Sequence, residues 1–290
     1  MIELLQYEFM RNALLAGLLA SVICGVMGTL VVTNRIVFLS GGIAHAAYGG
    51  IGMSVYFHWP YLAGASGFSV VAAWLMAAVS MKNKHRADTV IGVIWAMGMA
   101  TGIIFLDLSP GYNVDLIAYL FGSIIAVPDF HLWIMLVMAG VIVGLVFFFY
   151  NDFLALSYDE EFAKIRGVPT GVLYILMIVM LAVTVVMVIQ IVGLILVIAL
   201  LTIPPYIVEK RVNSLARMMI GASLLGAVFT VTGLWISCVY NLTSGAAIIM
   251  VAGTVFFVTT GIDRVTGRYK RKKAPPEPEH CGLTPINHNK

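Results

Sequence analysis

The sequence predicts an all-α, polytopic membrane protein, from its composition, its long apolar runs and the sorting of its charges. Hydrophobic residues make up 61% of the 290 residues and charged residues only 11%, against roughly 25% charged in an ordinary globular domain. Nine of the 31 charged side chains lie from residue 264 onward, which leaves 22 for the first 263 residues. So few charges could not cover a water-soluble fold of this size, so a soluble globular protein is excluded.

Nine apolar runs, separated by polar residues, are each expected to form one transmembrane helix. A helix needs about 20 residues to cross the hydrocarbon core. The runs cover residues 13–33, 36–57, 60–80, 89–107, 131–150, 169–190, 192–208, 218–239 and 244–262. Only Gln190 and Gly193 interrupt the stretch 169–208, so eight spans remain the alternative. Residues 117–126 are expected to form a short helix at the membrane edge.

The first run and the loop charges set the expected topology. The first run follows Glu3 and Glu8 and is too long for a signal-peptide core, so we expect it to be retained. Alternating the spans places most loop cations on one face, which the positive-inside rule makes the cytoplasm of a cell-membrane protein. These cations are Arg35, Lys82, Lys84, Arg86, Lys164, Arg166, Lys210, Arg211 and Arg217. The opposite face receives Arg11 with Glu3, Glu8, Asp107, Asp115 and Asp129.

The second run carries His45, the only histidine well inside a predicted span. At helical spacing, Gly41, Gly49 and Gly52 share its face. One interpretation is close helix packing through small residues, with the imidazole hydrogen-bonded to a neighbour. The other is that an ionisable group inside the membrane marks a transport pathway, since neutral imidazole ligates zinc-like ions well. The residues alone leave both interpretations open.

The third run contains Gly64-Ala65-Ser66-Gly67, which matches the GxSG of intramembrane serine proteases. A serine nucleophile needs a base within hydrogen-bond reach. His85 is expected in a cytoplasmic loop and His131 at an outer membrane edge. Short patterns of small residues also recur by chance in glycine-rich spans, so the protease is only a remote alternative.

The loop 151–168 is expected to contain a cytoplasmic helix from Tyr158 to Arg166. Ser157 followed by Glu160 fits a capping box. The acidic residues Asp159, Glu160 and Glu161 suit the positive end of a helix dipole. Gly167 and Pro169 supply the stop signals. The helix is either a solvated connector or a docking element for a cytoplasmic partner, and its well-defined ends favour docking.

The run 192–208 includes Gly193 and ends near Pro204-Pro205. Proline removes a backbone donor and breaks a helix, so the simpler expectation is that the helix terminates there. The alternative is a break inside the membrane, which is tolerated where protein or water satisfies the freed groups, with Gly193 and Pro204 as packing or pathway residues. Residues 1–263 would form the transmembrane domain and 264–290 a separate cytoplasmic tail.

The tail is basic and then proline-rich, which is typical of disorder. Its basic run is expected to lie at the anionic cytoplasmic leaflet. It also accounts for the net charge of +3, which therefore gives no argument for nucleic acid as a partner. A less favoured interpretation is metal binding by tail side chains, namely Glu277, Glu279, His280, Cys281 and His288.

The sequence lacks the motifs of nucleotide binding, zinc proteolysis and disulfide or thiol chemistry. The chain has no GxxxxGK[ST], so it has no P-loop for a nucleotide, and no HExxH of a zinc protease. Cys24, Cys238 and Cys281 form no CxxC and no disulfide framework.

The chain resembles the permease subunits of the zinc, manganese and iron ABC importers (ABC-3 type) from about Phe9 to Phe257. Four segments in order carry the resemblance: Phe9–Leu14 leading to Gly28, the glycine-rich stretch ending in His45-Ala46 and Gly49, Leu120–Ile124 with Asp129, and Gly193–Pro204. It implies a homodimeric core, similar in fold to the vitamin B12 and siderophore importers. Cytoplasmic ATPase subunits would supply energy, and an extracytoplasmic binding protein would deliver the metal.

The resemblance also implies roles for single residues. It makes the helix in 157–167 a coupling helix that meets the ATPase, with residues Ser157, Asp159, Glu160, Glu161, Ala163 and Gly167. Many members of the family have an aspartate four residues before the histidine, but this chain has Gly41. No Asp–His pair can form on this helix, so His45 alone, or His45 of both protomers, would contact the ion in transit. Weak ligation suits transit, because a tightly held ion does not leave.

These features lead to one expected function. We expect the membrane-spanning subunit of an ATP-driven importer of divalent transition metal, without an ATPase site or bound cofactor of its own. A permease for a larger chelate, such as a siderophore or cobalamin, is the alternative on the same architecture. The sequence does not choose among zinc, manganese and iron.

Overall fold

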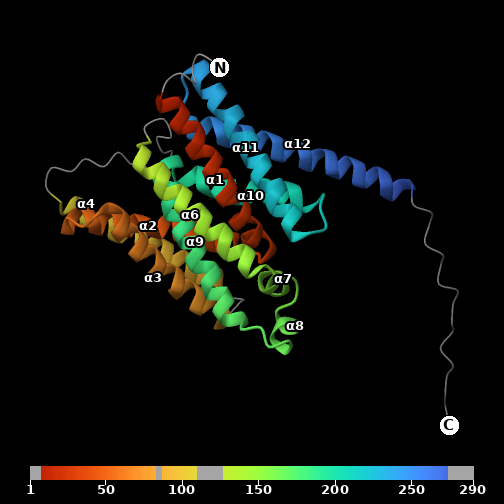
Figure 1. Cartoon of the computed structure of the whole chain (residues 1–290), viewed down its shortest axis with the longest axis horizontal. Helices are drawn as coiled ribbons and strands as arrows, with labels where there is room; N and C mark the ends of the chain where they lie inside the picture. The colour runs from red at the N-terminus through yellow and green to blue at the C-terminus, as the bar shows by residue number, and fades with distance from the viewer. Residues whose placement is uncertain (1–7, 83–86, 110–126, 274–290) are drawn as a thin grey trace, which may run out of the picture.

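The computed structural model describes residues 8–82, 87–109 and 127–273, and these residues form helices joined by short turns (Figure 1). Apolar runs give the helices their length, and turns fall at the polar and glycine residues between them. The helices are α1 (Glu8–Thr33), α2 (Val37–Phe57), α3 (Tyr61–Lys82), α4 (Ala87–Asp107), α6 (Asp129–Phe148), α7 (Tyr150–Tyr158), α8 (Glu160–Ile165), α9 (Thr170–Val192), α10 (Leu194–Glu209), α11 (Leu215–Tyr240) and α12 (Ser244–Lys273).

Each of the nine predicted runs is occupied by a separate helix, which confirms the all-α membrane fold. Seven of the described helices are long and apolar enough to cross a membrane. The other two runs hold the glycine-rich α2 and the 16-residue α10. Residues 169–208 form two helices, because Gly193 separates α9 from α10. The short helix predicted at 117–126 lies outside the described residues.

The long helices pack as two groups. In one group α2 contacts both α3 and α4, and in the other α1 and α10 contact α11, with α12 against α10 and α11. Figure 1 shows the first group at the lower left and α11 and α12 at the upper right. Helix α9 joins the groups, since it contacts α2 and α3 as well as α1 and α10. The buried core follows these contacts and consists of aliphatic side chains and alanine.

The turns predicted to share one face do meet at one end of the bundle. A pocket of about 620 Å³ is lined by residues from the α1–α2 turn, the end of α3, the start of α4, α8 and the start of α9. A second, of about 400 Å³, joins the ends of α1, α7 and α10 to the start of α11. We call this end, which carries Arg35, Lys164, Arg166, Lys210 and Arg211, the basic end.

The opposite end is closed by a polar contact between α1 and α6. The Asn12 amide donates to Asp129 Oδ1 at 2.7 Å and to the Val127 carbonyl at 3.3 Å. Asn12 is buried, and a buried amide is costly unless it is hydrogen-bonded. The start of α6 is therefore fixed against the start of α1.

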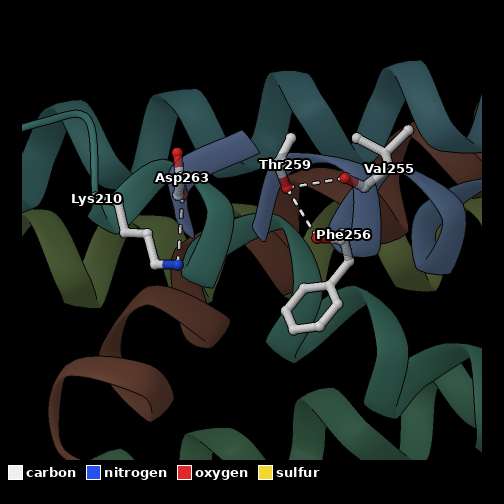
Figure 2. Close-up of polar contacts among 5 residues, drawn as sticks. All are labelled: Lys210, Val255, Phe256, Thr259 and Asp263. Atoms are coloured by element: carbon white, nitrogen blue, oxygen red, sulfur yellow. Dashed lines mark hydrogen bonds and ion pairs between the residues drawn. The ribbon is translucent and has the colours of Figure 1, made fainter. Parts of the chain in front are cut away.

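At the basic end, α12 is held against the end of α10. Figure 2 shows Lys210 Nζ reaching Asp263 Oδ2, at 3.5 Å. The same ammonium lies 4.7 Å from the centre of the Tyr206 ring, which packs on Phe256. An exposed ion pair adds at most about 1 kcal/mol to the free energy of unfolding. These contacts therefore fix where α12 lies against α10 but stabilise the fold little. Thr259 takes no part, because its hydroxyl donates to the carbonyls of its own helix (Figure 2).

Two predicted boundaries differ from the structure. Helix α12 continues past residue 262 to Lys273, so its backbone covers the first ten residues of the predicted tail; residues 274–290 lie outside the described part. The expectation that the helix ends at Pro204-Pro205 is wrong, because α10 continues to Glu209. Close packing explains the tolerance: a Cβ on Gly28 of α1 would collide with the Leu201 carbonyl and lie 2.9 Å from Pro205 Cγ. Leu201 is the carbonyl that Pro205 leaves without an i+4 donor, and it is covered by α1.

Candidate functional site

Helix α2 is rich in glycine because it lies almost in backbone contact with α4. A Cβ on Gly49 would lie 2.8 Å from the Gly98 carbonyl oxygen, and one on Gly52 would collide with Gly102. Conversely, a Cβ on Gly102 would lie 2.5 Å from the Tyr48 carbonyl oxygen. Small residues that let backbones approach are the usual interface of membrane helices. The packing interpretation therefore holds for Gly49 and Gly52.

The same contact places His45 against α4. Its ring stacks on Trp95, with centroids 4.1 Å apart and planes inclined by 17°. His45 is half-buried, and its Nδ1 is buried without a hydrogen-bond partner among the described residues. Trp95 is fixed in turn, since its Nε1 donates to Met99 Sδ at 3.3 Å. The imidazole is thus held by stacking, while its Nδ1 has no partner among those residues.

Gly41 has a different environment from the other glycines of α2. The nearest atom to a Cβ built there is Ile198 Cδ1 of α10, at 4.0 Å. The missing side chain therefore corresponds to space beside α10 and not to a helix contact. Over the described residues, His, Cys, Asp and Glu never gather in a group of three or more. Within the described residues, a single protomer therefore offers a metal ion one imidazole, that of His45, and an unfilled side-chain position one helical turn away at Gly41.

A carboxylate at this position should change metal binding. We expect Gly41→Asp to fold, because only ordinary contact with Ile198 is introduced, and to bind zinc about tenfold or more tightly than the unmodified chain, since second ligands typically contribute at that scale. Zinc titration of the purified chain by calorimetry measures the effect. Gly92→Asp on α4 is the matched control, because nothing lies within 4 Å of a Cβ there, and its zinc affinity should equal that of the unmodified chain. Equal zinc affinity in Gly41→Asp and the unmodified chain would show that His45 and residue 41 do not address one ion.

The junction of α9 and α10 is a second irregular place inside the bundle. Gly193 has φ 85° and ψ 162°, a conformation open essentially only to glycine. Both the start of α9 and the end of α10 lie at the basic end, so the chain reverses at this residue. The 16 residues of α10 rise about 24 Å, less than the roughly 30 Å of the hydrocarbon core.

This junction leaves polar groups at membrane depth. The Gln190 Nε2 is buried and has no partner among the described residues. Helix α2 packs against both α9 and α10, so the junction borders the helix that carries His45. Irregular backbone at membrane depth is tolerated where protein covers it or where it lines a cavity.

The predicted loop helix is present, with different ends. Ser157 belongs to the last turn of α7, and α8 starts at Glu160. The cap is Asp159, whose Oδ1 accepts from the Phe162 N–H at 2.9 Å, so the capping box from Ser157 to Glu160 is wrong. Ser157 cannot cap α8, because it lies within α7, whereas Asp159 between the two helices is extended at φ −153°, as a cap residue must be.

The stop signal is confirmed at the other end of α8. Gly167 has φ 79°, and its N–H donates to the Lys164 carbonyl at 3.0 Å. The Val168 N–H reaches the Ala163 carbonyl at 3.1 Å, which completes a Schellman motif. Glycine is required because other residues are strained at positive φ.

Helix α8 exposes apolar side chains although it lies beyond the long helices. Ile165 is 84% exposed and Phe162 52%, and Tyr158 at the end of α7 is 69% exposed beside them, while Ala163 is the residue of α8 that is buried. Lys164 pairs with Glu160 at 2.7 Å, and the Arg166 guanidinium lies over the Phe162 ring. Exposed apolar residues ringed by charges are typical of a surface that contacts another protein or the membrane. We call Tyr158, Phe162 and Ile165 the α8 apolar face.

The GxSG segment has a packing role in α3. A Cβ on Gly64 would collide with the Ser54 hydroxyl and lie 2.9 Å from the Gly50 carbonyl oxygen. His131 is on α6, where its ring contacts Phe130, and His85 lies outside the described residues. Nothing in the described part supplies Ser66 with a base.

Sequence reasoning missed four residues in these arrangements. Trp95 carries no polar signature that separates it from a lipid-facing residue. Gly98 and Gly102 form a small-xxx-small pattern that was visible in the fourth run. Asn34 looked like an ordinary turn residue, and only the fold brings it to Ser157.

The comparisons with known proteins cover nearly the whole described chain. The sequence profile of the ABC 3 transport family matches residues 6–262. An uncharacterised membrane protein of Synechocystis is 49% identical over 264 residues, which is 91% of this chain and 94% of that protein. The manganese transport system membrane protein MntC of Listeria monocytogenes is 32% identical over 255 residues, covering 88% of this chain and 91% of MntC.

A solved structure agrees with the fold. PsaBC from Streptococcus pneumoniae, in complex with a Fab, superposes with a TM-score of 0.80 at 29% identity. The match covers 89% of this chain and 93% of that chain.

Proposed function

Because the chain belongs to the ABC 3 transport family, we propose that it is the permease subunit of an ATP-driven importer of a divalent transition metal ion. The manganese transport named for its relatives favours a free ion over a siderophore or cobalamin chelate. Zinc, manganese and ferrous iron are the candidates, and uptake measured with each ion in turn distinguishes them.

The α8 apolar face carries this proposal. In an ABC importer, a membrane subunit without a P-loop would receive its energy from an ATPase partner, and α8 offers that partner a contact surface with both ends capped. Apolar anchors surrounded by charge are typical of the centre of a protein–protein contact. ATP would be bound and hydrolysed by ATPase subunits, and their movement would reach the chain through α8.

The basic end would then face the cytoplasm, in accord with the positive-inside rule. The opposite end, where Asn12 meets Asp129, would receive metal from an extracytoplasmic binding protein. We infer a homodimer, so that two copies of α2 could line one path. This arrangement supplies a second imidazole without requiring a second ligand from the same chain.

The path would run past His45 and the α9–α10 junction. The buried Nδ1 of His45 and the Gln190 amide are both without partners among the described residues, and an ion in transit could use such groups in passing. The two groups belong to packed neighbours, α2 and α9. Because these ligands are few and uncharged, they would bind the ion weakly enough to release it.

Changing the α8 apolar face tests the proposal. We expect Ile165→Asp to weaken ATPase binding about thirtyfold or more, since removing a central anchor typically costs about 2 kcal/mol. The chain itself should stay folded, because Ile165 is 84% exposed. Co-purification with the ATPase subunit from detergent-solubilised membranes measures the effect.

Ile165→Leu is the matched control and should retain the ATPase. Glu161→Gln and Gly167→Ala extend the test to the charged rim and to the stop of α8. Normal co-purification and ATP turnover in Ile165→Asp would remove α8 as the docking element.

A further inference from the structure

The turn between α1 and α2 contains a side chain that touches three helices. Asn34 Nδ2 donates to the Leu30 carbonyl at 2.8 Å and to Ser157 Oγ at 2.9 Å, and lies 3.6 Å from Met177 Sδ. These partners belong to α1, α7 and α9. One amide thus ties the start of α2 to the segment that ends in α8.

The segment α7–α8 has few other fixed points near α8. The start of α7 is held by Phe153, which is fully buried, and by the Tyr150 hydroxyl, which accepts from the Ala216 N–H at 3.2 Å. In α8, Ala163 is buried while the apolar face is exposed. Ser157 is therefore one polar attachment between the docking helix and the long helices.

Open space flanks this attachment on both sides. The pocket of about 620 Å³ is lined by Asn34, Leu156 and Glu160. The pocket of about 400 Å³ is lined by Thr33, Ser157 and Tyr158. Close-packed interiors resist displacement, so a segment bordered by two pockets can shift where a packed one could not.

Beyond Asn34 the chain leads directly to the pathway helix. Arg35 takes a left-handed conformation with φ 57°, and α2 begins at Val37. His45 lies eight residues further, about 12 Å along the helix. Because α2 and α4 are in near-backbone contact at their glycines, a displacement at Val37 would move His45 and Trp95 together.

We propose that Asn34, through its hydrogen bond to Ser157, is the positioning residue that transmits movement of α8 to α2. The proposal rests on the proposed function, since it takes α8 as the docking helix. Asn34 contacts neither the metal path nor the α8 apolar face, so its role is to connect two moving parts.

The test measures coupling in the whole transporter. The chain, its ATPase subunits and its binding protein are reconstituted in proteoliposomes, with radioactive zinc and manganese ions as probes. The readout is the number of ions imported per ATP hydrolysed. We expect Asn34→Ala and Ser157→Ala each to lower this ratio about fivefold or more, the usual range of coupling between sites, while ATPase co-purification stays unchanged.

A double-mutant cycle separates coupling from simple loss of structure. The double variant should be no worse than Asn34→Ala alone, because Ser157→Ala removes only a bond that Asn34→Ala has already removed. Ser157→Thr keeps the hydroxyl and should restore the ratio. Asn151→Ala, which changes an exposed asparagine at the start of α7 that lines neither pocket, is the matched control and should leave the ratio unchanged.

Three results would overturn the proposal: an unchanged ratio in Asn34→Ala and Ser157→Ala, additive losses in the double variant, or no recovery in Ser157→Thr. If Asn34→Ala fails to fold, the Ser157→Ala and Ser157→Thr pair decides. Failure of the docking proposal is distinguishable, because it is read from ATPase binding in Ile165→Asp and not from the ratio.

Discussion

Import of metal should fall at least tenfold in His45→Ala, while assembly with the ATPase stays intact. The reason is that, among the histidines that the structure describes, His45 is the one inside the bundle. Its Nδ1 lies buried without a hydrogen-bond partner among the described residues. Loss of a metal contact typically reduces activity about 10–100-fold. Uptake of zinc, manganese and ferrous iron into proteoliposomes, with ATPase co-purification in parallel, measures both parts of the expectation.

His131→Ala is the matched control for this prediction. His131 lies near the start of α6, with its ring against Phe130, and should import metal at the normal rate. His45→Phe provides a second comparison, because it keeps a ring for Trp95 to stack on but removes both nitrogens. Normal uptake in His45→Phe would assign His45 to packing alone.

Gly102→Val should prevent α2 and α4 from packing. A Cβ at this position would lie 2.5 Å from the Tyr48 carbonyl oxygen and 2.8 Å from its carbonyl carbon. Backbone atoms cannot move aside as a side-chain end can, so the cost should reach the upper end for overpacked sites, about 3 kcal/mol or more. The melting temperature and the monodisperse yield in detergent measure the loss.

Gly92→Val on the same helix is the control, since nothing lies within 4 Å of a Cβ there. The two variants add the same side chain to the same helix and differ in the neighbour they meet. Equal stability of Gly102→Val and Gly92→Val would contradict the close contact between α2 and α4.

The sequence was a good guide wherever one physical effect dominated. Apolar runs must bury their backbone polar groups in helices within a bilayer, so the nine runs predicted nine helices. Gly167 was correctly predicted as a stop, because positive φ leaves little choice of residue. Gly49 and Gly52 were correctly marked as unusual, although sequence could not decide between packing and transport.

Prediction failed where tertiary contacts compete with local preference. Ser157 is a good helix cap by local preference, but it lies within α7, and Asp159, which is extended between the two helices, caps α8 instead. Pro204 and Pro205 should end a helix, yet α1 packs closely enough at Gly28 to cover the freed carbonyl of Leu201. Stacking of His45 on Trp95 depends on the register between α2 and α4, which no local pattern specifies.

The single-residue junction at Gly193 has a consequence for how the protein can vary. An α-helix turns about 100° per residue, so one inserted or deleted residue between α9 and α10 would rotate every side chain of α10 by that angle. Pro205 would leave Gly28, and Ile198 would leave the space beside Gly41. Length at this point is therefore as strongly constrained as residue identity, and a one-residue gap there would be more damaging than most substitutions in either helix.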